Sequence, residues 1–146
     1  MIVGSAAIDV TAKPGPEIEA ELANRSTAPG TVAMSLGGVA RNIAEATHRV
    51  TSHLSPSSPR CVLVSPVGDD PFGRMLMDET AQFGMRVDGF IKTQGATAVC
   101  NMILDKDGGL VGGVADMGIT AKLKADDVAL NFLPCDMNII THPVIH

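Results

Sequence analysis

Short apolar runs alternate along this chain with segments in which apolar residues recur every three or four positions. The apolar runs lie at 2–8, 61–67 and 137–141, and the helix-like segments lie at 39–54, 71–83 and 125–132. Parallel strands need a crossover connection, which is usually a helix, so this alternation predicts an α/β domain with a parallel central sheet. The length of 146 residues suits one domain.

A second group of segments predicts a smaller sheet outside the α/β layer. Residues 31–36 alternate between apolar and polar side chains, which is typical of a half-exposed strand. Two further strand-like runs, 97–104 and 110–115, flank an acidic, glycine-rich turn that favours a hairpin. Prolines and glycines at 13–30 indicate a loop, with a short helical turn at 17–23.

The segment 39–54 has the clearest helical period. Its apolar positions are Val39, Ile43, Ala46, Val50 and Leu54. His48 and His53 lie on the polar side of this period, so we expect them to be solvated. The polar, proline-containing stretch 55–59 ends the helix.

The helix predicted from residue 71 has recognisable start and stop signals. Asp70 suits the N-cap, Pro71 suits the first helical position, and Gly84 suits the end. Asp69 and Asp70 together could also be read as a metal-binding pair. The capping interpretation is favoured, because the proline and the periodic segment follow directly.

Composition excludes several classes of function. The net charge is −5, Trp and Tyr are absent, and no stripe of Lys and Arg occurs, so we expect no nucleic-acid partner. No apolar stretch is long enough to span a bilayer and no secretory signal is visible, so we expect a cytoplasmic protein without a membrane partner. Cys61, Cys100 and Cys135 form no CxxC pair, so neither a metal site nor a disulfide framework is predicted.

Four residues are candidates for binding a ligand. Asp9 is predicted to follow the end of the first strand, where open α/β sheets bind ligands, and a carboxylate there can accept hydrogen bonds from two neighbouring sugar hydroxyls. The pair Gly37 and Gly38 would allow close backbone approach. Asn42, in the first turn of the next helix, could both donate to and accept from a ribose hydroxyl. A plain turn would also explain the aspartate and the glycines.

Other polar side chains give weaker signals. Arg41 could contact an anion, but a solvated surface charge is the favoured interpretation. His142 and His146 would share a helix face, but Pro143 disfavours a helix there, so both are expected to be tail residues.

Four motifs, in order, resemble the ribokinase-like (PfkB-type) carbohydrate kinases. They are GSAAID at 4–9, SLGGVARNIAEA at 35–46, VGDDPFGRML at 67–76 and TAVCNMILDKDG at 97–108. Within that family, GGVARN and the VADM at 114–117 are most similar to pseudouridine kinases. The resemblance implies a ribokinase-like parallel sheet with flanking helices and a small β lid made of 31–36 and 97–115. It covers the N-terminal part of such a domain, truncated at its C-terminal side.

The resemblance also implies a function. A nucleoside, most simply pseudouridine, or a sugar would lie across Asp9, Gly37, Gly38 and Asn42 beneath the lid, and ATP with Mg²⁺ would phosphorylate its 5′-hydroxyl. The family's Gly-Ala-Gly-Asp motif, which holds the catalytic base, does not occur in this sequence, so no catalytic residue or nucleotide site is assigned. The alternative is a non-catalytic fragment or interaction module that keeps the lid and a partial nucleoside site. The lid could also form a homodimer.

Overall fold

The computed structural model describes residues 1–15, 27, 29–54 and 61–132. The helical turn expected at 17–23, the linker 55–59 and the strand expected at 137–141 lie outside these residues. So do Cys135 and the two histidines near the end of the chain. No helix in the described part of the chain is long and apolar enough to cross a membrane.

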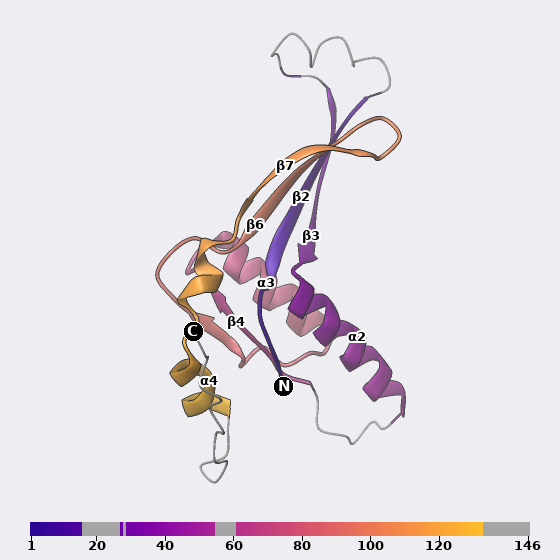
Figure 1. Ribbon diagram of the computed structural model, residues 1–146. Coiled ribbons are helices and arrows are strands. Elements are labelled where there is room, and N and C mark those ends of the chain that lie inside the picture. Colours follow the sequence, from indigo (N-terminus) through magenta and orange to yellow (C-terminus); the bar gives the residue numbers. More distant parts are fainter. Residues whose placement is uncertain (16–26, 28, 55–60, 133–146) are drawn as a thin grey trace, which may run out of the picture.

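A parallel sheet forms the body of the molecule, as predicted. Its strands are β1 (Ile2–Val3), β4 (Leu63–Val67) and β5 (Phe90–Lys92), in the order β1–β4–β5. Helix α2 (Val39–Leu54) precedes β4, and helix α3 (Pro71–Gln82) connects β4 to β5 (Figure 1). The three-residue β5 was not predicted, because so short a strand has no periodicity to detect.

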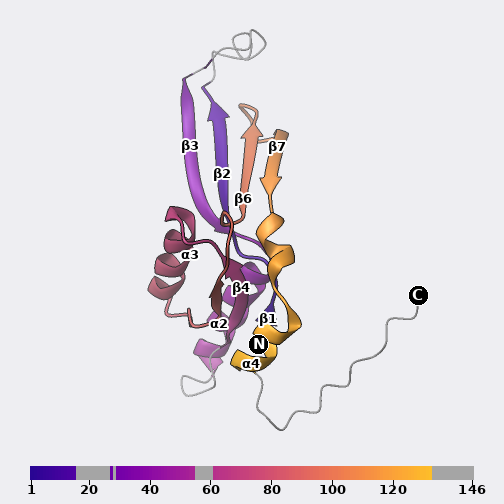
Figure 2. The same ribbon diagram turned by 90° about the vertical axis from the view of Figure 1, so that its left-hand side faces the viewer.

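A second sheet stands outside the body and confirms the predicted lid. Its strands are β2 (Ala7–Pro14), β3 (Gly30–Gly37), β6 (Val99–Leu104) and β7 (Leu110–Asp116), in the order β3–β2–β6–β7. Strand β2 pairs antiparallel with β3 and parallel with β6, and β6 and β7 form the expected hairpin. The long strands project away from the helices in both views (Figures 1 and 2).

The first apolar run does not form one strand ending at Asp9, so that prediction was wrong. Strand β1 ends at Val3, and the chain then crosses into the lid sheet, where β2 continues to Pro14. Gly4 lies at the crossing, with a φ of +157°, and a Cβ there would come within 2.7 Å of the Ala40 Cβ. The close approach of α2 at this glycine therefore accompanies the break between the two strands.

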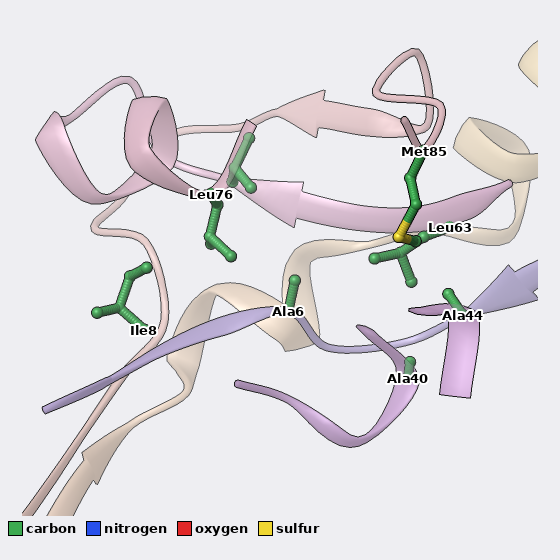
Figure 3. Close-up of a cluster of buried hydrophobic side chains, with 8 residues drawn as sticks. Ala6, Ile8, Ala40, Ala44, Leu63, Leu76 and Met85 are labelled. Atoms are coloured by element: carbon green, nitrogen blue, oxygen red, sulfur yellow. The ribbon is translucent and has the colours of Figure 1, made fainter. Parts of the chain in front are cut away.

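The core is built from small and aliphatic side chains. Its buried members come from both sheets, from the crossing between β1 and β2, from α2 and α3, and from the segment after α3: Ala6, Ile8, Ala40, Ala44, Leu63, Val67, Leu76 and Met85 (Figure 3). The two alanines of α2 let this helix lie close to β1 and β4. Burial of these apolar surfaces is the main source of the fold's stability.

Helix α2 buries a different face from its most apolar one. Its buried residues are Ala40, Arg41, Ala44 and His48. Its large apolar side chains are exposed: Val39, Ile43, Val50 and Leu54. The expectation that His48 is solvated is therefore wrong, because His48 is 8% exposed. The exposed state of His53 agrees with the prediction.

Helix α3 begins as predicted. The Asp70 carboxylate accepts a hydrogen bond from the Gly73 N–H at 2.8 Å, which is the N-cap interaction. The same carboxylate accepts from the N–H and the hydroxyl of Thr97, at 2.7 and 2.8 Å. Asp70 thus joins α3 to the segment that leads into β6, and Asp69 points to the surface, where it pairs with Lys92.

The chain then turns back along the body. After β7, a short 3₁₀ helix η1 (Gly118–Lys122) leads to helix α4 (Ala125–Phe132), which starts and ends where the sequence predicted. Ile119 of η1, which was not predicted as an element, is buried against Ala7 and Ala98 at the base of the lid.

Candidate functional site

Asp9 lies within β2, near the base of the lid sheet. Its backbone partners are Ser35 on β3 and Cys100 on β6. Residues paired directly across strands share one face, so Ser35 and Cys100 flank Asp9 on its face of the sheet. Neither neighbour was identified from the sequence, because a strand's register depends on partners far away in the chain.

The side chain of Asp9 lies against Gly37. A Cβ at position 37 would lie 2.2 Å from Asp9 Oδ2 and 2.4 Å from Oδ1. Any other residue at position 37 would therefore displace the carboxylate. This contact gives Gly37 a specific structural role and brings two of the predicted site residues together.

The Asp9 carboxylate has free acceptor capacity. Within the described residues, it accepts no hydrogen bond and forms no ion pair, and partial burial raises the pKa of this carboxyl above its ordinary value. An ionised carboxylate offers two oxygens that can only accept. A ligand with two hydroxyls that donate hydrogen bonds to the carboxylate would compensate for the hydration that the carboxylate loses on burial.

Gly38 satisfies a requirement of the chain's own backbone. Its φ is +96°, and a Cβ there would come within 2.5 Å of the Ser5 carbonyl oxygen and 2.8 Å of the Ala6 Cα. The tight strand-to-helix turn considered from the sequence accounts for this glycine. The Gly38 carbonyl accepts from the Asn42 N–H at 3.0 Å, which opens α2.

Asn42 lies in the first turn of α2 and is exposed. Its Oδ1 accepts a hydrogen bond from an Arg41 guanidinium nitrogen at 3.2 Å. The Asp9 side chain thus lies against Gly37, where β3 ends, and Asn42 lies one helical turn beyond Gly38. No hydrogen bond joins the two side chains within the part of the chain that the structure describes.

Arg41 is the site residue that sequence reasoning misjudged. The favoured interpretation was a solvated charge, but Arg41 is only 5% exposed. It forms an ion pair with Glu45 at 2.5 Å, and its guanidinium lies 5.6 Å from the centre of the Phe83 ring. The spacing of Arg41 and Glu45, one helical turn apart, was the available signal, although such pairs are usually exposed.

The described residues include no group of three or more His, Cys, Asp or Glu side chains that could hold a metal ion. Asp70, one of the two candidates from the sequence, already accepts three hydrogen bonds, one as the cap of α3 and two from Thr97.

Comparison with known proteins identifies the family. The model of the pfkB family carbohydrate kinases matches residues 1–134. The chain belongs to this family. Pseudouridine kinase of Escherichia coli (strain K12) is 31% identical over 130 residues, which are 88% of this chain and 38% of that protein. This pfkB-family chain therefore spans well under half the length of that relative.

Solved structures show the same fold. A fructokinase from Xylella fastidiosa with bound ATP matches 86% of this chain and 36% of its own, with a TM-score of 0.63 and 22% identity. A ribokinase from Thermotoga maritima matches 78% of this chain and 34% of its own, with a TM-score of 0.61 and 20% identity. The pfkB-family chain thus has the ribokinase-like α/β fold that its motifs predicted.

Proposed function

We propose that this chain is the nucleoside-binding part of an ATP-dependent kinase that phosphorylates a ribonucleoside 5′-hydroxyl, with pseudouridine as the first candidate. Membership of the pfkB family supports a carbohydrate or nucleoside kinase. The 31% identity to pseudouridine kinase supports the choice of nucleoside. The bound ATP of the related fructokinase supports the choice of phosphoryl donor.

The observation that supports a sugar site best is the Asp9 carboxylate. It is partly desolvated, lies against Gly37, and has no protein donor within the described residues. A ribose presents two neighbouring hydroxyls on one side of its ring, and each can donate to one carboxylate oxygen. Asn42, one turn beyond Gly38, would supply a further polar contact.

A non-catalytic binding module is the second candidate. The sequence contains no Gly-Ala-Gly-Asp motif, the motif that holds the catalytic base in the family it resembles. Such a module would bind the nucleoside through the same side chains without transferring phosphate. Both candidate functions predict that the nucleoside binds, but only the kinase predicts that it is phosphorylated.

Calorimetric titration with pseudouridine tests the proposed site. Asp9→Ala should weaken binding by about 1.5–3 kcal/mol, the contribution of hydrogen bonds to a charged group. Asp107→Ala, which removes an exposed carboxylate at the tip of the lid hairpin, is the matched control and should leave binding unchanged. Equal affinities for the Asp9→Ala variant and the unaltered chain would refute the assignment.

The pH dependence of binding provides a second test. Only the ionised Asp9 carboxylate can accept a hydrogen bond from a hydroxyl on each oxygen without carrying a proton of its own. The affinity for pseudouridine should therefore fall as the pH falls through the pKa of Asp9. Because burial raises that pKa, the loss should begin at a higher pH than for an ordinary aspartate. The Asp9→Ala variant should not show this loss.

A further inference from the structure

We infer that Arg41 is a positioning residue, which fixes the Asn42 amide so that its NH₂ group faces the bound ribose. This inference rests on the proposed function, because it concerns the same nucleoside site. It adds a residue that touches no ligand and acts only through Asn42.

The chemistry of the guanidinium determines the orientation of the amide. Arginine has donors and no acceptor, so the Asn42 atom 3.2 Å from Arg41 must be the carbonyl oxygen. The NH₂ group lies on the other side of the planar amide, directed away from Arg41. Asn42 therefore offers donors to a ligand, whereas Asp9 offers acceptors.

Arg41 is held firmly enough to impose this orientation. Its guanidinium is buried, paired with Glu45 and packed over the Phe83 ring. Glu45 also pairs with Arg49, whose guanidinium lies 5.3 Å from the centre of the same ring. Two arginines, one carboxylate and one ring thus form a network in which Arg41 has little freedom to move.

The bond to Asn42 is separable from the role of this network in stability. Glu45 already compensates the charge of Arg41, so burial of the guanidinium does not require the exposed amide. Arg49 pairs with Glu45 and lies over Phe83, as Arg41 does. Within the described residues, its side chain donates to Glu45 and not to Asn42. Arg49 is therefore a natural control, which has the structural contacts without the bond to Asn42.

A ribose hydroxyl fits the resulting pair of groups. It can donate its proton to the Asp9 carboxylate and accept from an Asn42 N–H at the same time. Without Arg41, the amide could turn and present its oxygen, which cannot donate. Arg41 would then influence affinity through the orientation of Asn42.

The test is a double-mutant cycle in pseudouridine affinity, measured by calorimetry together with urea unfolding. Arg41→Met should weaken binding about three- to tenfold, the range for loss of one hydrogen bond. Arg49→Met should lower stability and leave affinity within about twofold. In an Asn42→Ala background, Arg41→Met should have no further effect on affinity, because the residue through which it acts is gone.

Arg41→Lys provides a second variant if Arg41→Met does not fold. Lysine keeps the charge beside Glu45, but its compact ammonium lacks the planar fork that reaches two partners, so affinity should still fall. If either Arg41 variant keeps full affinity for pseudouridine, the role of Arg41 is refuted while the proposed function stands. The same holds if Arg41→Met weakens binding equally with Asn42 present and in the Asn42→Ala background. If Asp9→Ala and Asn42→Ala both bind as tightly as the unaltered chain, the proposed function fails as well.

Discussion

At the scale of single residues, Gly37 and Asp9 depend on each other. A methyl group at position 37 would overlap all three atoms of the Asp9 carboxyl group, at 2.2–2.4 Å. Gly37→Ala should therefore displace the carboxylate and reduce pseudouridine affinity at least as much as a lost hydrogen bond, roughly tenfold. Gly112→Ala in the same sheet is the control, because a Cβ there meets no atom within 4 Å. Calorimetry that shows equal affinities for the two variants would contradict this dependence.

Asp70 should make folding stability depend on pH. Burial alone would raise the pKa of this carboxyl, but hydrogen bonds from Thr97 and from the first turn of α3 lower it overall. A lowered pKa in the folded state means that its stabilisation is complete above the ordinary aspartate pKa and is lost as the pH falls through the folded value. Asp70→Ala should cost about 1–2 kcal/mol near neutral pH, and less in acid.

Urea unfolding at several pH values measures this effect. Asp69→Ala is the control, since its exposed carboxylate forms a surface pair with Lys92, and such pairs contribute little to stability. A constant difference in stability between Asp70→Ala and the unaltered chain across the acid range would argue against the cap as its source.

At the scale of elements, α2 shows what the sequence could and could not predict. The spacing of its apolar residues and the position of the glycine pair predicted where the helix begins and ends, and both ends were correct. The spacing of the apolar residues did not predict which face of the helix is buried. The small side chains of Ala40 and Ala44 are buried because they let the helix approach the sheet more closely than Ile43 or Val50 would. Arg41 and His48 are buried on that face through partners after α3, such as Phe83, which no local pattern reveals.

The lid has one apolar face along its outer part. Register places Val32 and Met34 of β3, Ile103 of β6 and Val114 of β7 on one face, and each is between 47 and 74% exposed. Asp9 lies on the opposite face. We propose that a second copy of the chain covers the apolar face, which leaves the Asp9 face free for a ligand.

Sedimentation equilibrium measures this self-association. The unaltered chain should be dimeric at micromolar concentrations, and Val114→Lys should shift it towards monomer, because a charge would be buried in the interface. Val50→Lys is the control, since Val50 is similarly exposed on α2, away from the lid. A monomeric unaltered chain, or a dimer lost with Val50→Lys alone, would contradict a lid interface.

At the scale of the whole molecule, the alternation of strands and helices in the body was predictable, and the relation of the two sheets was not. Four ordered motifs in the sequence are enough to indicate the fold and the lid strands 31–36 and 97–115. The crossing from body to lid at Gly4 depends on how closely α2 packs there, a tertiary contact. The placement of Asp9 inside a lid strand, with Ser35 and Cys100 beside it, depends on the same crossing.

The last prediction is that this 146-residue chain, by itself, binds pseudouridine without phosphorylating it. Phosphoryl transfer needs the nucleotide held in line with the acceptor hydroxyl, and charge stabilisation around the transferred group. The sequence contains no Gly-Ala-Gly-Asp motif to place a catalytic base, and correct orientation alone can supply roughly 7–11 kcal/mol of the barrier. Incubation with ATP, Mg²⁺ and pseudouridine should therefore yield no pseudouridine 5′-phosphate by mass spectrometry, with Escherichia coli pseudouridine kinase as the positive control. Turnover at an ordinary enzymatic rate, abolished by Asp9→Ala, would show that the chain's own residues complete the site.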